Sequence, residues 1–333
     1  MLNFLKLTDQ DAAERAQRKA TPRDRLKTAA ALAVTAALLW VMISRAGWRD
    51  VSAALSRISP EHAVLIFAAA MAMTIGVHTD RLRAVLALGG CVMSWRQALW
   101  LRMGTLPLAL VLPAKSGDLF RAFYLRTHHG ASLARGAGIV VAEKMLAMAG
   151  TLALVVLGAA LGGGRGAAHE WTLAGACALG AAAFSAASYA ILKKGFLKNA
   201  GNAVPPPHFN RAFVAAFAYS VLALAAESMV AWLALRALGQ PVSAAVILFR
   251  VPLVQVAALL PFSMRGMGVR EAGYWALLQG YARESALVSA GLVSSFCLYA
   301  VPTLIGLLFM QGFVDRSFPE KNSYSNANEL GCK

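Results

Sequence analysis

The feature that most constrains this chain is a series of eight apolar runs, each about 16 to 28 residues long. A helix needs about 20 apolar residues to cross the roughly 30 Å hydrocarbon core of a bilayer. Only 14% of the 333 residues are charged, whereas an average soluble domain carries about 25%. The sequence therefore predicts an all-α integral membrane protein. The runs lie at 29–45, 62–79, 98–113, 136–161, 171–192, 212–235, 242–262 and 286–313.

Two of these runs are poor candidates for spanning helices. Runs 98–113 and 242–262 each contain an arginine and an internal proline, and each reaches a Leu-Pro pair near its end. A glycine-containing polar turn and a second short amphipathic stretch follow, near 117–126 and 267–282. Short, proline-interrupted hydrophobic segments are typical of re-entrant hairpins, which enter and leave a membrane on the same side. The alternative is that both runs are simply short helices of a bundle.

The distribution of lysine and arginine discriminates between these two topologies, because cytoplasmic loops are enriched in both residues. With eight spans and a cytoplasmic N-terminus, 16 basic residues fall inside and 14 outside. With six spanning helices plus two re-entrant hairpins, 22 fall inside and 8 outside. We therefore predict the six-span topology, with both termini cytoplasmic, in a bacterial-type inner (cytoplasmic) membrane.

The six-span topology also predicts an internal repeat. Residues 29–161 and residues 171–313 both have the order span, span, hairpin, span. Three crossings in each half are an odd number, so the second copy is expected to be inverted, as in many transporters. The remaining segments are a basic cytoplasmic tail at 1–28, a short external loop at 162–170 and a polar, disordered tail at 314–333.

The two hairpin turns are the candidate binding sites. A proline is expected to end the first half-helix of each hairpin, and glycines let the backbone turn; these residues are Pro113, Gly117, Pro261, Gly266 and Gly268. The next half-helix then begins with exposed amides and a positive dipole end, which favour an anion. Basic side chains add charge there and are candidates for binding a head-group phosphate: Lys115, Arg121, Arg265 and Arg270. The alternative for each is an interfacial anchor.

Four acidic residues are candidates for charge balance, for binding a head-group amine or for proton coupling: Asp118, Glu143, Glu227 and Glu271. Glu143 and Glu227 lie within apolar runs, where a charge costs about 2.5–3.5 kcal/mol on insertion scales. Glu143 and Lys144 are adjacent and point in different directions on a helix. We therefore expect at least one of them to reach another element, such as the first hairpin turn. The alternative is a buried structural pair or a neutral acid.

Charge, cysteine and histidine content exclude several other classes. The net charge of +16 fits contact with anionic lipid, and we expect no nucleic-acid partner because no soluble domain presents a basic face. The four cysteines are scattered without CxxC spacing, so a disulfide framework is not expected. The six histidines have no metal-ligand spacing on a helix. We expect no cofactor and no metal.

The hairpin residues resemble those of the flippase-like transmembrane family associated with lysylphosphatidylglycerol synthases. That family typically has Leu-Pro-Gly-Arg-x-Gly-Glu-x-x-Arg after the third run, Glu-Arg-x-x-Asp in the next span, and later Pro-x-Ser followed by Gly-x-Gly-Val-Arg-Glu. The corresponding residues here are Leu112 to Asp118 with Arg121, then Glu143 and Lys144, then Pro261, Ser263, Gly266, Gly268, Arg270 and Glu271. The resemblance covers about residues 29–313, and the departures from it are Ala114, Lys115 and Ala147.

The resemblance implies translocation of a lipid, such as a phospholipid, a polyprenyl-linked glycan or a hopanoid-type lipid. Only 20 residues follow residue 313, so we do not expect the lysyl transfer of the family's soluble domain. The leading hypothesis is a flippase for an anionic or polyprenyl-type lipid, with membrane lipids and a lipid-biosynthetic enzyme as partners. The alternatives are an integral membrane enzyme acting on a lipid phosphate and an accessory subunit of lipid or glycolipid biosynthesis. Neither a nucleophile nor an acidic metal cluster is visible, so no enzymatic activity is expected.

Overall fold

The structure is a computed structural model, and all the elements that it describes are helices. It describes residues 22–111, 118, 120–164, 168–199, 209–258 and 266–317.

The first half of the chain forms a long helix, a broken second helix, a helix pair and another long helix. Its elements are α2 (Pro22–Ala46), α3 (Trp48–Leu55), α4 (Pro60–Ala72), the π-helical turn η2 (Met73–Val77), α5 (His78–Leu88), α6 (Trp95–Val111), α7 (Phe120–His129) and α8 (Leu133–Ala160).

The second half follows the same order, with the break in its last helix. Its elements are α9 (Ala168–Asn199), α10 (Phe209–Ala237), α11 (Ala244–Ala257), α12 (Val269–Leu278), α13 (Glu284–Ser295), the π-helical turn η4 (Phe296–Ala300) and α14 (Val301–Ser317).

Serine residues fix the starts of several helices. The side chains of Ser59, Ser132 and Ser243 accept hydrogen bonds from backbone N–H groups in the first turns of α4, α8 and α11. Such N-caps satisfy donors that the helix itself leaves unpaired. Pro60 follows Ser59 as the first helical residue of α4, a position where its missing N–H costs nothing.

The chain is an all-helical, multi-pass membrane protein. Within the described ranges, five helices are long and apolar enough to cross a bilayer: Pro60–Leu88, Leu133–Ala160, Ala168–Gly195, Phe209–Ala237 and Glu284–Phe313. They contain five of the six predicted spans. The first predicted span, 29–45, lies in α2, of which Thr35–Ala46 forms a shorter apolar stretch.

The helices α8 and α10 are central and α9 is peripheral. In their most apolar stretches, 56% of α8 and 44% of α10 is buried, against 17% of α9. The helix α10 packs against α4, α5, α8, α11 and α13. Since lipid covers the outer face of a membrane bundle, this burial pattern is the one expected of a helix that faces lipid.

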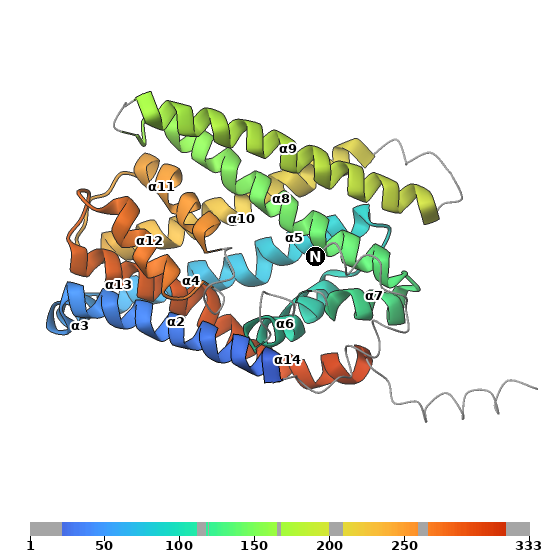
Figure 1. Cartoon of the computed structure of the whole chain (residues 1–333), viewed down its shortest axis with the longest axis horizontal. Coiled ribbons are helices and arrows are strands. Elements are labelled where there is room, and N and C mark those ends of the chain that lie inside the picture. Colours follow the sequence, from blue (N-terminus) through green and yellow to red (C-terminus); the bar gives the residue numbers. More distant parts are fainter. Residues whose placement is uncertain are drawn as a thin grey trace, which may run out of the picture.

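The two poor spanning candidates form helix pairs at the predicted places. The first pair is α6 and α7, and the second is α11 and α12. The pairs lie towards opposite ends of the bundle (Figure 1). The turns within them, at 112–117 and 259–265, lie outside the described residues, so Pro113, Lys115, Gly117, Pro261 and Arg265 have no structural account.

Each hairpin packs against the last span of the opposite half. The helix α6 runs along α14, where a Cβ atom on Gly306 would lie 2.7 Å from the carbonyl oxygen of Met103. The helix α11 runs along the C-terminal end of α8, where a Cβ atom on Gly158 would overlap the backbone of Phe249. Glycines allow this close approach of backbones, as is usual between membrane helices.

Candidate functional site

A cavity of about 180 Å³ lies inside the bundle, where the two hairpins meet the central helices. Its lining comes from α5, α6, α7, α8, α10, α11, α12 and η4, together with Asp118. The charged and titratable residues that line it are His78, Arg81, Arg102, Asp118, Arg121, Glu143, Lys144, Glu227 and Arg270.

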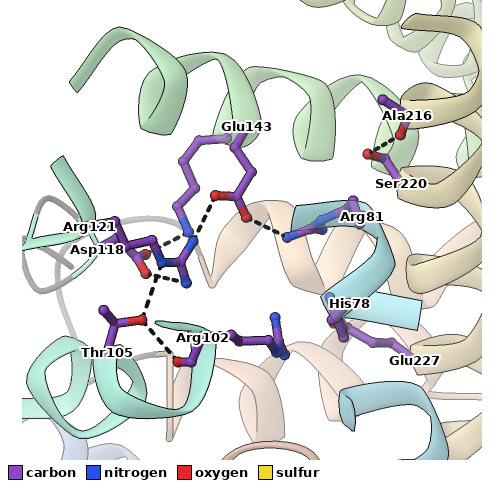
Figure 2. Close-up of polar contacts among 11 residues, drawn as sticks. His78, Arg81, Arg102, Thr105, Asp118, Arg121, Glu143, Ala216, Ser220 and Glu227 are labelled. Carbon is purple, nitrogen blue, oxygen red and sulfur yellow. Dashed lines mark hydrogen bonds and ion pairs between the residues drawn. The ribbon is translucent and has the colours of Figure 1, made fainter. Parts of the chain in front are cut away.

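Glu143 on α8 is the centre of one buried cluster in this cavity. Arg121 Nη1 lies 2.7 Å from Glu143 Oε2, and Arg81 Nη2 lies 3.1 Å from Glu143 Oε1. Figure 2 shows the two guanidinium groups approaching the carboxylate from opposite sides. The Glu143 side chain is only 3% exposed, and each of its oxygens is held by a different arginine. This arrangement provides the pairing that a buried carboxylate requires.

Asp118 extends this cluster towards the surface. Its two carboxylate oxygens lie 3.2 Å from Arg121 Nη2 and 2.6 Å from Lys144 Nζ. Arg121 also donates from Nε to the hydroxyl of Thr105 on α6, at 3.2 Å. Arg121 on α7 therefore joins the second helix of the first hairpin to α6, the other helix of that hairpin, and to α8.

Glu227 on α10 is the centre of a second cluster. His78 Nε2 lies 3.2 Å from Glu227 Oε1, and the Tyr299 hydroxyl donates to Glu227 Oε2 at 3.0 Å. Gln255 on α11 accepts a hydrogen bond from Arg270 Nε at 3.2 Å. The Arg270 guanidinium carbon lies 3.6 Å from the centre of the Tyr299 ring, which is a cation–π distance. Arg270 of the second hairpin thus contacts Tyr299, which in turn donates to Glu227.

The two π-helical turns flank this second cluster. His78 follows η2 directly, and Tyr299 lies within η4. A π turn contains an extra residue and is frequent at functional sites. Here the two wide turns each deliver one hydrogen-bond partner of Glu227.

The cavity carries a surplus of positive charge. Its described lining contains five lysine or arginine residues and three carboxylates, a difference of two positive charges with His78 neutral. Five apolar side chains, Leu106, Ala147, Met148, Leu224 and Leu298, also line its described part. A cavity with this combination suits an anionic group attached to an apolar body. Within the described ranges, no three His, Cys, Asp or Glu residues are arranged to hold a metal ion.

The chain also matches a known protein family. The model of the lysylphosphatidylglycerol synthase TM region matches residues 28–306. The chain belongs to this family. None of the curated proteins matches the chain. The residues that match the family model include every described residue that lines the cavity.

The structure brings together five of the residues singled out from the sequence. Asp118, Arg121, Glu143, Glu227 and Arg270 all line the cavity. The expectation that Glu143 or Lys144 reaches another element is confirmed, because Glu143 forms an ion pair with Arg121 of the first hairpin. Lys144 forms its ion pair with Asp118 and not with the adjacent Glu143.

The second hairpin turn differs from the expectation in one respect. The exposed amides expected at the start of α12 include that of Gly268, but its N–H donates to the Glu271 carboxylate at 2.6 Å. Glu271 is buried and does not line the cavity. Gly266 and Gly268 have φ angles of 84° and 82°, a region that favours glycine. Glu271 therefore stabilises the turn, and that amide is not open to an anion.

Sequence reasoning missed several cavity residues of this family member. Arg81 and Arg102 are not among the predicted site residues, yet both side chains are buried and line the cavity. His78, Gln255 and Tyr299 were not singled out at all. The available signal was the polar cluster at the end of run 62–79, which extends from His78 to Arg81.

Proposed function

We propose that this protein moves a lipid with a phosphate-bearing head group, either a phospholipid or a polyprenyl-type lipid, across the membrane. The observation that carries the proposal is the positively charged cavity within the bundle, to which both hairpins contribute side chains. Membership of the family supports a role connected with membrane lipids.

The cost of moving a charged head group explains why such a cavity is useful. An isolated ion in hydrocarbon is strongly disfavoured because it loses its water. In the proposed mechanism, Arg121 and Arg270 bind the phosphate and replace part of that water, while the lipid chains stay in the bilayer. Lys115 and Arg265 add charge at the two hairpin turns. Glu143, Glu227 and Asp118 balance the charge of the arginines or couple movement to protons, and Glu271 acts through the turn that it stabilises.

The packing pattern supports an inverted repeat of six spans and two re-entrant hairpins. The contact of α7 with α8 corresponds to that of α12 with α13, and the contact of α6 with α14 corresponds to that of α11 with α8. The two hairpins lie towards opposite ends of the bundle (Figure 1). Each hairpin would then face one side of the membrane, as alternating access requires. We place the protein in a bacterial-type cytoplasmic membrane, where a lipid-biosynthetic enzyme would supply its substrate.

Lipid movement in reconstituted vesicles tests this function. Vesicles containing the protein and a trace of fluorescent phosphatidylglycerol are treated with an impermeant quencher, and the loss of inner-leaflet label is followed. We expect the wild type to expose the inner label faster than protein-free vesicles do. Arg270→Ala should slow this rate about tenfold, because about 1.4 kcal/mol of interaction with the moving phosphate corresponds to a tenfold change.

Two further variants complete the experiment. Arg121→Lys keeps a positive charge beside Glu143 and should lower the rate less than Arg121→Ala does. Arg283→Ala removes an exposed arginine outside the cavity and should leave the rate unchanged. Wild-type vesicles that behave like protein-free vesicles would contradict the transport function and favour an accessory role. Movement only with added divalent metal would favour an enzyme acting on the lipid phosphate.

A further inference from the structure

One carboxylate in the cavity is bound in the way that a phosphate would be. Asp118 Oδ1 lies 3.2 Å from Arg121 Nη2, and Asp118 Oδ2 lies 2.6 Å from Lys144 Nζ. Two oxygens of one anionic group therefore each contact a different cation. A phosphate with two free oxygens offers the same charge-assisted contacts. Arg121 and Lys144 thus form a subsite for which a phosphate and Asp118 would compete.

The Asp118–Lys144 pair is more exposed than the Glu143–Arg121 pair. The side chain of Glu143 is 3% exposed, that of Asp118 is 12% exposed and that of Lys144 is 40% exposed. Glu143 has both oxygens held by arginines, Arg81 and Arg121. An incoming anion can therefore exchange with Asp118 at Lys144 and Arg121 while Arg81 continues to hold Glu143.

Building on the proposed function, we propose that Asp118 is an internal competitor of the substrate phosphate for Arg121 and Lys144. The substrate class is an anionic phosphate ester or phosphodiester on a lipid. Binding displaces Asp118 from the two cations, and the return of Asp118 helps the phosphate to leave. A site that moves ions must bind them strongly enough to admit them and weakly enough to release them, and Asp118 sets that balance.

Removing the charge of Asp118 tests the competition directly. Purified protein in detergent is titrated by calorimetry with dihexanoylphosphatidylglycerol, with inorganic phosphate and with dihexanoylglycerol, which has no phosphate. Asp118→Asn should bind the phospholipid about tenfold more tightly than the wild type, the gain expected if the carboxylate occupies the subsite about nine-tenths of the time. Lys144→Gln should weaken binding. Dihexanoylglycerol should show no difference between the wild type and Asp118→Asn.

A matched control variant accompanies this test, and several outcomes would contradict the inference. Asp80→Asn removes a carboxylate that pairs with Arg83 outside the cavity, and should not change the affinity. Unchanged or weaker phospholipid binding by Asp118→Asn would overturn the inference and leave Asp118 as a support for the two cations. Tightening for inorganic phosphate alone would overturn the assignment to a lipid. Binding without lipid movement in vesicles would overturn only the proposed transport.

A second measurement uses the wild-type protein. The Asp118 and Lys144 side chains are in contact, so a carbodiimide should join them as an amide, with loss of one water to the reagent. Mass spectrometry of the digested protein would detect this crosslink. Dihexanoylphosphatidylglycerol should suppress the crosslink, and dihexanoylglycerol should not. A crosslink yield that the phospholipid leaves unchanged would overturn the competition even if Asp118→Asn did not fold.

Discussion

At the residue scale, the cavity depends on carboxylates that are each held by groups from several helices. Glu143 joins α8 to Arg81 on α5 and Arg121 on α7. Glu227 joins α10 to His78 and Tyr299. Removing one partner of a buried ion pair costs more than the pair itself contributes, since the remaining charge stays buried. These two residues therefore affect folding as well as binding.

This argument predicts a large loss of stability for Glu143→Gln. The variant leaves Arg81 and Arg121 without their shared carboxylate, so the free energy of unfolding should fall by about 3–5 kcal/mol. Thermal unfolding in detergent micelles measures this loss. Glu61→Gln changes an exposed residue in the first turn of α4 and should cost less than about 1 kcal/mol. Equal unfolding temperatures for the two variants would contradict the structural role of Glu143.

The sequence predicted some residues of the cavity and could not predict others. Glu143, Glu227, Arg121 and Arg270 stand out because they are charged residues in or beside apolar runs. Arg81 does not stand out in this way, because it follows the end of run 62–79, where the low hydropathy indicates a loop. In the structure α5 continues to Leu88 and packs against α8 and α10, which buries Arg81. The packing of α5 against distant segments, which hydropathy does not report, makes Arg81 a cavity residue.

At the element scale, glycines set how closely the hairpins approach the spans. The sequence predicted that runs 98–113 and 242–262 are short and lead into second helices, which α6–α7 and α11–α12 confirm. It could not predict that each hairpin packs against the last span of the other half. That pairing depends on which surfaces have room for a backbone, as at Gly158 on α8 and Gly306 on α14.

A single added methyl group at the α8–α11 contact is expected to be destabilising. The Cβ atom of Gly158→Ala would overlap backbone atoms of Phe249, which cannot move as a side-chain end can. We expect the free energy of unfolding to fall by about 1–3 kcal/mol. Gly175→Ala on α9 meets nothing within 4 Å and should be neutral or stabilising by up to about 1 kcal/mol. Thermal unfolding of both variants measures these effects. An unchanged unfolding temperature for Gly158→Ala would contradict the prediction, because it would show that α8 and α11 can move apart without cost.

At the scale of the whole molecule, two hairpins lie towards opposite ends of the bundle (Figure 1), and both contribute side chains to one cavity. The sequence predicted hairpins on opposite sides from run lengths and charge counts. It did not predict the π-helical turns, because a π turn differs from an α turn in hydrogen bonding and not in hydropathy. The proposed six-span topology places the starts of α6 and α11 in different compartments.

Labelling of single cysteines tests this topology. Ser94 precedes α6 and Ser243 precedes α11, and both are exposed. In a background without the native cysteines, Ser94→Cys should react with an impermeant maleimide only after cells are opened, because the first hairpin is placed on the cytoplasmic side. Ser243→Cys should react in intact cells. Reaction of both positions from one side would exclude an inverted arrangement of the hairpins.

The two π turns have a consequence for how this chain tolerates length changes. Each turn holds one residue more than the α-helical turn that would replace it. Losing a single residue from Met73–Val77 or Phe296–Ala300 would restore regular winding and leave the faces before and after it pointing as they do now. The same loss would change the local winding at Tyr299, which lies within one turn, and at His78, where the other turn ends, and both contact Glu227. A one-residue deletion would therefore disturb the helical winding least at these two turns, and the same deletion would disturb the contacts of the buried Glu227 most.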